Sequence, residues 1–280
     1  MVLRLRVSLE RVSVPRARSG RGGPAYGERV PIEDPFADLD VGDAPRSLIV
    51  LGGTLDVATL VASYRAGCFP WPASGDGQKA LDRHARRLVR RGEVPLLPGT
   101  DGLVPWCSPD PRAILLADEV VVRRSLRARL RSCGWTATVD AAFDDVVAGC
   151  ADRSEGTWIH ARMRQAYGEL HRAGGAHSVE IWDGSSLVGG LYGVLVGQVF
   201  CGESMFHRAR DASKVALVEL CDRLLEAGVR VIDVQEETEH LASLGQVLVA
   251  RYDYLELLEA LRDRPATLAR DRRPVARLAA

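Results

Sequence analysis

The chain has 280 residues, of which 46% are hydrophobic and 26% are charged, as in ordinary water-soluble globular proteins. Its 37 basic side chains balance 37 acidic ones, so a nucleic-acid partner must be sought in local basic clusters. No run of about 18 apolar residues occurs, and the basic start lacks the continuous apolar segment of a secretory signal. We therefore predict a cytoplasmic protein with no membrane partner.

The six cysteines also favour a reducing compartment. They form no CxxC pair, and no histidine neighbours them at the spacing of zinc ligands. We expect buried, reduced thiols and no metal site.

The first half of the chain is irregular. Residues 1–45, rich in Arg, Gly, Pro and Asp, predict a flexible extension. Residues 47–51 predict a strand that ends at Gly52-Gly53, and Thr54 or Asp56 then caps a helix that runs to about residue 65. Two prolines make residues 68–72 a rigid loop. Residues 73–105 resemble an insertion with a basic helix at 79–91.

From Trp106 onward the pattern is regular. Strands are expected at 113–116, 120–122 and 135–139, and helices at 123–132, 143–150 and 159–170. Three strands of a meander follow at 178–182, 187–196 and 198–203, with turns at Asp183-Gly184 and Gly197. An amphipathic helix at 212–226, strands at 229–235 and 246–249, a helix at 253–262 and a frayed tail complete the chain. The order predicts an α+β fold, with a mixed sheet flanked by helices.

A first candidate site is Asp233-Val234-Gln235, at the end of the apolar strand predicted at 229–235. Because side chains alternate along a strand, Asp233 and Gln235 should face one side, while Ile232 and Val234 point the other way. A carboxylate beside a carboxamide at a strand end can form a polar site. The alternative is a strand that runs into a solvated loop, because three glutamates follow closely.

Glu203 is a second candidate, at the end of another apolar strand and between aromatic residues. A carboxyl group in that position needs a partner or a ligand, because burying it unpaired is costly. Gly202 lets another group approach the backbone. The alternative is a salt bridge from Glu203 to Arg208 or Lys214.

Aromatic residues make up only 6% of the chain, yet several lie in or beside loops. The set is Tyr64, Phe69, Trp71, Trp106, Trp158 and Tyr167. Trp71 and Trp158 lie in loops that contain Pro or Gly, where a flat ring can stack on a nucleic-acid base. The alternative is that each ring anchors the core.

Two basic stripes can meet a phosphate backbone. Arg124, Arg127 and Arg131 share one helical face, and Arg123 borders them. The second stripe lies in the insertion and comprises Arg83, Arg86, Arg87, Arg90 and Arg91. A charge run is more often a solvated face, and that alternative stays open here.

Together, these segments resemble the leucyl/phenylalanyl-tRNA–protein transferase family. The matching stretches are 64–71, 106–112, 156–159, 176–180, 189–193, 200–206, 211–214, 233–235 and 240–245. Each motif alone is weak, but their succession in the family's order, from about residue 48 to residue 258, is specific.

The resemblance implies an aminoacyltransferase that moves Leu or Phe, with Met as a further candidate, from charged tRNA to the N-terminal Arg or Lys of an acceptor protein. Such a transfer marks the acceptor for degradation by the N-end rule. The implied fold has a small N-terminal α/β domain at 46–108, with residues 73–105 inserted, and a GNAT-like catalytic domain at 109–262. Residues 263–280 form a tail.

The resemblance also assigns roles by position. Glu203, Asp233 and Gln235 fall on the family's catalytic positions, and no cofactor is implied. The expected pocket for the aminoacyl side chain comprises Leu191, Phe200, Leu220 and Leu224. The terminal adenosine is expected near Tyr64, Trp71, Trp158 and Tyr167, and the tRNA-facing helix carries Arg124, Arg127 and Arg131.

This chain departs from the family pattern in three places. Cys107 stands where members usually have a second Trp. The loop after Gln235 reads Glu-Glu-Thr-Glu, where many relatives are less acidic. Leu220 and Leu224 occupy positions that can be Phe, which implies a differently shaped pocket.

The donor ester is already activated, so the enzyme mainly has to orient the acceptor amine and manage protons. The carbonyl oxygen of Gln235, polarised by Asp233, can accept a hydrogen bond from that amine, and the ribose 2′-hydroxyl is an equally open route. Glu203 and Asp233 would supply negative field for a basic N-terminal residue.

Three other functions compete. An acyl-CoA N-acetyltransferase needs a Gly-rich turn for pyrophosphate, and the turn at 207–213 has no glycine. A peptidoglycan-type aminoacyltransferase also uses charged tRNA, but the short chain and the specific motifs count against it. A tRNA-binding module without activity is the third.

Overall fold

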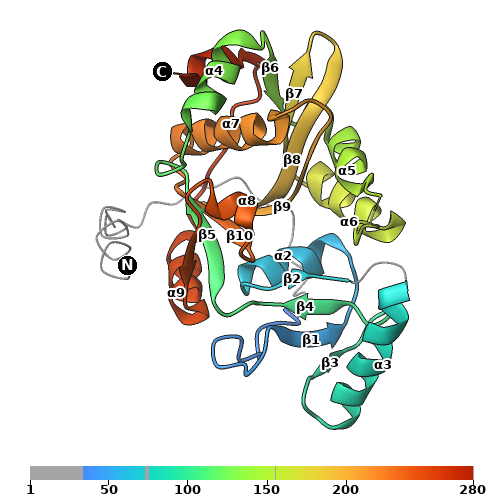
Figure 1. The fold of residues 1–280 in the computed structure, drawn as a ribbon. Helices are drawn as coiled ribbons and strands as arrows, with labels where there is room; N and C mark the ends of the chain where they lie inside the picture. Colours follow the sequence, from blue (N-terminus) through green and yellow to red (C-terminus); the bar gives the residue numbers. More distant parts are fainter. Residues whose placement is uncertain (1–33, 73–75, 155, 280) are drawn as a thin grey trace. The chain divides into compact units, whose positions relative to one another are not determined.

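The computed structural model describes residues 34–72, 76–154 and 156–279 (Figure 1). The first part of this chain forms a four-stranded sheet in the order β2-β4-β1-β3. Its strands are β1 (Leu48–Gly52), β2 (Phe69–Pro70), β3 (Leu96–Leu97) and β4 (Pro105–Cys107). Helices α2 (Val57–Arg65) and α3 (Asp76–Arg90) lie in the same part of the chain. β1 pairs with β3 in parallel and with β4 antiparallel.

The second sheet has eight strands in the order β11-β5-β10-β9-β8-β7-β6-β12. They are β5 (Arg112–Leu116), β6 (Thr136–Val139), β7 (Ala176–Asp183), β8 (Ser186–Val196), β9 (Val199–His207), β10 (Val231–Gln235), β11 (Val247–Val249) and β12 (Arg273–Pro274). β9 and β10 pair in parallel, whereas the meander β7-β8-β9 is antiparallel. The predicted mixed α+β architecture is therefore confirmed.

Helices cover both faces of the meander. The helices of this part of the chain are α4 (Arg124–Ser132), α5 (Phe143–Ala151), α6 (Ala161–Arg172), α7 (Ala212–Glu226), α8 (Glu239–Ala242) and α9 (Arg251–Leu261), with the 3₁₀ helix η1 (Val275–Ala279), and α5, α6 and α7 contact the meander. Two adjacent glycines of β8 show how closely the helices approach. A Cβ at Gly189 would lie 2.6 Å from Ala212 on α7, and a Cβ at Gly190 would lie 3.1 Å from Val146 on α5. Since neighbouring residues face opposite sides of a strand, α7 and α5 sandwich the sheet (Figure 1).

Local sequence signals explain the helices that carry the site. Asp56 caps α2 by accepting a hydrogen bond from the Thr59 N–H at 2.8 Å. α7 spans the predicted residues and buries Ala216, Leu220 and Leu224 against the sheet. No helix among the residues that the structure describes is long and apolar enough to span a bilayer.

One predicted strand is wrong. Residues 120–122 form no strand, because Val121 makes one backbone bond, to the Leu244 carbonyl, rather than a ladder. Val120 and Val122 still pack against the core, which explains their apolar character.

Both ends of the described chain are more ordered than predicted. Phe36, in the predicted extension, is 2% exposed and meets Trp106 edge-on, with 5.3 Å between ring centroids. The predicted frayed tail is wrong beyond residue 272, because Arg273 and Pro274 pair with β6 and Val275 is fully buried. Residues 1–33 of the predicted extension lie outside the described residues.

The predicted domain boundary near Ser108 falls between the last strand of the first sheet and β5. By its contacts, however, Asp34–Ala280 forms one compact unit. Arg251 on α9 contributes to this cohesion by donating to the carbonyls of Ser108 and Arg46. The two-domain division therefore stays a prediction.

Candidate active site

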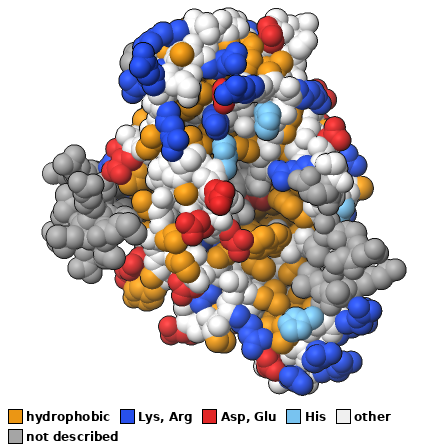
Figure 2. All heavy atoms as spheres, viewed as in Figure 1, with side chains coloured by type: hydrophobic (Ala, Val, Ile, Leu, Met, Phe, Trp, Pro, Cys, Tyr) orange, Lys and Arg blue, Asp and Glu red, His pale blue; other side chains and the backbone are white. Residues whose placement is uncertain are grey.

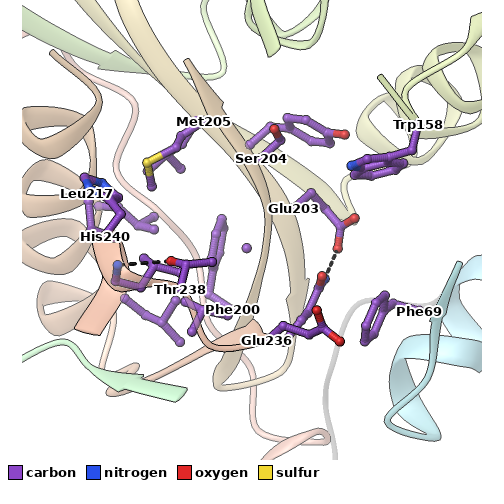
Figure 3. A pocket seen from close by; sticks show the side chains of 18 of the residues that line it. Phe69, Trp158, Phe200, Glu203, Ser204, Met205, Leu217, Glu236, Thr238 and His240 are labelled. Carbon is purple, nitrogen blue, oxygen red and sulfur yellow. Dashed lines mark hydrogen bonds between the residues drawn. The ribbon is translucent and has the colours of Figure 1, made fainter. Parts of the chain in front are cut away.

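A cavity of about 510 Å³ lies where β8, β9 and β10 meet α7, α8 and the segment at 69–71. Its apolar lining comprises Leu191, Phe200, Met205, Leu217, Leu220, Ile232, Val234 and Leu241. Figure 3 shows Phe69, Trp158 and Glu203 toward one end and Met205, Leu217 and His240 toward the other. The cavity thus offers an apolar part and an aromatic part, with a carboxyl group beside the aromatic part.

Glu203 and Gln235 form a hydrogen-bonded pair in this cavity (Figure 3). The Gln235 Nε2 donates to Glu203 Oε1 at 2.7 Å, and the Tyr167 hydroxyl donates to Glu203 Oε2 at 2.7 Å. Tyr64 lies 2.6 Å from the Tyr167 hydroxyl, oxygen to oxygen. Both carboxylate oxygens therefore have donors, and the alternative salt bridge from Glu203 to Arg208 or Lys214 does not form.

Burial raises the pKa of Glu203 to about 7. Desolvation is the main cause, and the hydrogen bonds from Tyr167, Tyr64 and Gln235 oppose it. A carboxyl group with this pKa changes charge near neutrality, which suits a group that must manage a proton.

A bulge in β10 places Gln235 at the cavity. The register against β5 shifts between Asp233 and Gln235, and Gln235 has a φ of 68°. The Gln235 N–H donates to Asp233 Oδ1 at 3.0 Å, which fixes this conformation. Ile232, Val234 and Gln235 all line the cavity. The predicted strict alternation along this strand is therefore wrong, because the bulge turns Gln235 to the face of Val234.

Asp233 is fully buried and lies away from the cavity. Arg112 on β5 binds it with two bonds, from Nε to Oδ1 at 2.8 Å and from Nη2 to Oδ2 at 2.6 Å. The Tyr254 hydroxyl on α9 donates to Oδ2 at 2.8 Å. The Asp233 charge is thus paired with Arg112, and its contact with Gln235 is to the backbone N–H rather than to the carboxamide that it was expected to polarise.

Three of the four residues predicted for the aminoacyl pocket line the cavity, namely Leu191, Phe200 and Leu220. Leu224 does not, because it lies one turn beyond Leu220 on α7 and is fully buried in the core. Leu217, one turn before Leu220, lines the cavity instead.

The aromatic set divides into two groups. Trp71 and Trp158 line the cavity and are partly exposed. Tyr64 and Tyr167 are 1% and 0% exposed, so they present no ring face to the cavity, and their expected place near the adenosine stays a prediction. They act instead on Glu203 through their hydroxyls. Trp106 is a core anchor that donates from Nε1 to the Gly52 carbonyl at 2.8 Å.

The predicted basic helix is α4, and none of its arginines lines the cavity. Leu126 and Leu130 bury its inner face, whereas Arg124, Arg127 and Arg131 are exposed. The second stripe lies on α3, which belongs to the part of the chain with the other sheet, and Arg83, Arg86, Arg87 and Arg90 are exposed there.

Several residues that build or line the site were not predicted from the sequence. Arg112 lies in a matching motif without an assigned role, and only the distant pairing of β5 with β10 brings it to Asp233. Tyr192 lines the cavity and could have been predicted, because it is the aromatic residue of the Gly189–Gly193 motif. Its buried hydroxyl has no hydrogen-bond partner among the described residues. Within the described residues, no group of three or more His, Cys, Asp or Glu is placed to hold a metal ion.

The fold and the cavity define an α+β protein with a partly apolar substrate site beside a titratable carboxyl group. The model of the leucyl/phenylalanyl-tRNA protein transferase family matches residues 114–259. Curated leucyl/phenylalanyl-tRNA–protein transferases are similar to the chain over most of its length. The protein of Shewanella baltica strain OS155 is 42% identical, over 82% of this chain and 87% of the relative. That of Chromohalobacter salexigens is 46% identical, over 77% of this chain and 75% of the relative.

The chain therefore belongs to the leucyl/phenylalanyl-tRNA–protein transferase family. It is an aminoacyltransferase that moves an amino acid from charged tRNA to the N-terminus of a protein. Among solved structures, a conserved protein of unknown function from Bacteroides thetaiotaomicron aligns over 76% of this chain and 88% of its own, with 15% identity and a TM-score of 0.39. That likeness is too distant to inform function.

Proposed function

We propose that the 510 Å³ cavity is the transfer site and that the Glu203–Gln235 pair orients the acceptor amine. The observation that carries the proposal is the direction of the bond between them. Because Gln235 donates from Nε2 to Glu203, its carbonyl oxygen is left as an acceptor. A primary amine that attacks an ester presents N–H donors, and this oxygen can hold one of them.

The donor fits the cavity in two parts. Leu191, Phe200, Leu217 and Leu220 offer an apolar surface for a Leu, Phe or Met side chain. Trp71 and Trp158 offer flat faces for the terminal adenosine, whose stacking is worth on the order of 1–3 kcal/mol per base. The ester then joins these two parts, and Figure 3 shows Glu203 at the aromatic one.

The acceptor is a protein with N-terminal Arg or Lys. Glu236 lines the cavity next to Gln235, whereas its neighbour Glu237 is exposed and does not line it. A cationic side chain beside the reacting amine finds complementary charge there, and favourable charge pairing selects it over a neutral residue. In the cell, such a transfer marks the acceptor for degradation by the N-end rule.

The chemistry requires no cofactor. The amine attacks the ester carbonyl, the C–O bond to the ribose breaks, and the amine proton passes to the departing ribose oxygen, directly or through the 2′-hydroxyl. Gln235 holds the amine in line for attack, and Glu203 holds Gln235. The GNAT-like character of the larger sheet and the small domain at 46–108 belong to the same proposal.

The test is single-turnover transfer of leucine from leucyl-tRNA to an Arg-peptide by Gln235→Ala. We expect the rate to fall at least 100-fold while leucyl-tRNA affinity changes less than twofold, because the variant removes the acceptor of the amine hydrogen bond and leaves the apolar and aromatic parts of the cavity in place. Gln165→Ala is the matched control, since this exposed glutamine of α6 lies outside the cavity. A normal rate in Gln235→Ala would remove Gln235 from the mechanism. Retained binding without transfer by the wild type would favour a tRNA-binding module.

A further inference from the structure

A second cavity, of about 480 Å³, lies beside the transfer site and shares His240 with it. Its other lining residues come from the segment that leads from β9 into α7, namely His207, Arg208, Arg210, Asp211, Ser213 and Lys214. The transfer mechanism uses none of these side chains.

The cavity carries a net positive charge. Three of its residues, Arg208, Arg210 and Lys214, are cationic, and Asp211 is its one carboxylate. Asp211 lies 3.6 Å from the Lys214 Nζ and 3.8 Å from the Arg210 Nε, so it offsets one of the three charges. The Arg208 guanidinium is held in place by the Leu187 carbonyl at 3.2 Å. Two positive charges therefore remain for a ligand.

Unused hydrogen-bond donors face the same space. Ser213 is 6% exposed and lines the cavity, yet its hydroxyl has no hydrogen-bond partner among the described residues. Asp211, with a φ of 69°, precedes α7 without capping it, and no described group accepts from the N–H of Ser213 or Lys214. The Ser213 hydroxyl is therefore free to donate to a ligand in this cavity, and the first turn of a 15-residue helix favours an anion.

The position of the cavity indicates which anion it takes. On one side Asp211 lies 4.0 Å from Arg129 of α4, the helix that also exposes Arg124 and Arg127. On the other side His240 separates the cavity from the transfer site. Figure 2 shows Lys and Arg side chains gathered where α4 and α7 lie, and acidic side chains nearer α8. Basic surface therefore leads from α4 to the site that receives the end of a tRNA.

We propose that this second cavity binds a backbone phosphate of the donor tRNA, through Lys214, Ser213 and the first N–H groups of α7. The proposal rests on the transfer of an amino acid from tRNA, because the phosphate belongs to that donor. The bond geometry of a phosphate suits the site, since one oxygen can take the ammonium group while another takes the hydroxyl and the helix N–H groups.

The experiment compares two donors, leucyl-tRNA and 3′-O-leucyl adenosine, which has the aminoacyl ester but no phosphate. Lys214→Ala and Ser213→Ala are the test variants. Arg172→Ala is the matched control, because this exposed arginine of α6 lies outside both cavities. We expect Lys214→Ala to lower kcat/KM for leucyl-tRNA at least fivefold more than for the adenosine ester. Lys214→Ala should also reduce, by about one, the slope of the logarithm of the tRNA binding constant against the logarithm of the salt concentration.

Three results would overturn the proposal. One is an equal loss with both donors, which would mean that Lys214 acts on the ester or on the fold. Another is no loss with either donor. The third is binding of inorganic pyrophosphate that Lys214→Ala abolishes while leucyl-tRNA kinetics stay unchanged, which would assign the cavity to a free anion. A wild type that uses neither donor would instead contradict the transfer function itself.

Discussion

At the scale of single residues, the protonation state of Glu203 determines how the site is hydrogen-bonded. Its two oxygens accept from Tyr167 and Gln235, and the ionised form offers both of them as acceptors. Protonation would turn one of these oxygens into a donor and so rearrange the hydrogen bonds that hold Gln235. With a pKa of about 7, Glu203 gains this form as the pH rises through neutrality.

The pH dependence of transfer tests this role. The acceptor α-amine must also lose a proton, with a pKa of about 7.7–8.0. Below pH 6 the logarithm of the single-turnover rate should therefore rise with a slope of about two in the wild type, and with a slope of about one in Glu203→Gln. The same slope in both proteins would show that ionisation of Glu203 does not control the rate.

The burial of Glu203 also makes the stability of the fold depend on pH. The pKa of Glu203 in the folded protein lies above the ordinary glutamate value of 4.5, so the protonated carboxyl group stabilises the fold, and this contribution is lost as the pH rises from about 4.5 to about 7. The functional carboxylate is thus retained at a cost in stability.

At the scale of elements, β10 shows where sequence patterns succeed and fail. The apolar run and its polar end predict the strand and its functional character. Strict alternation does not predict the bulge, which depends on the Asp233 side chain holding the Gln235 N–H. Nor does it predict Arg112, which lies 121 positions from Asp233 in the chain. Pairing across that separation is set by tertiary structure.

Asp233 should therefore behave as a structural partner of Arg112. Asp233→Asn leaves a buried guanidinium without its counter-charge, so we expect the free energy of unfolding to fall by about 3 kcal/mol, measured by urea denaturation. The double variant Arg112→Met, Asp233→Asn should lose less than the sum of the two single losses, because neither charge is then left alone. Additive losses would show that the pair is not coupled.

At the scale of the whole molecule, the order of strands and helices from β5 to α9 follows closely from the sequence, because the meander and α7 have clear periodicity and turn residues. The composition of the cavity wall, in contrast, cannot be predicted from the sequence pattern. The wall combines segments from Phe69 to Leu241, and Trp71 joins Trp158 there although 87 positions separate them. Local patterns identify such residues singly, and only the packed sheet and helices determine which of them meet.

The exposed arginines of α4 lie outside both cavities, so their proposed role concerns the body of the tRNA. Reversing the charge at Arg124 and Arg127 should reduce the log–log salt slope of tRNA binding by about one for each lost phosphate contact. Arg131 is the less suitable position, because its Nη2 also donates to the Ala279 carbonyl at 3.2 Å. An unchanged slope would mean that these arginines form only a solvated face.

The most direct test of the central claim is transfer of labelled leucine from leucyl-tRNA to two peptides that differ only in their first residue, Arg or Ser. We predict that the wild type labels the Arg-peptide at least tenfold faster than the Ser-peptide. Glu236→Gln should narrow this preference, whereas the control Glu237→Gln, an exposed neighbour that does not line the cavity, should preserve it. Absence of transfer to either peptide, with leucyl-tRNA bound, would contradict the account.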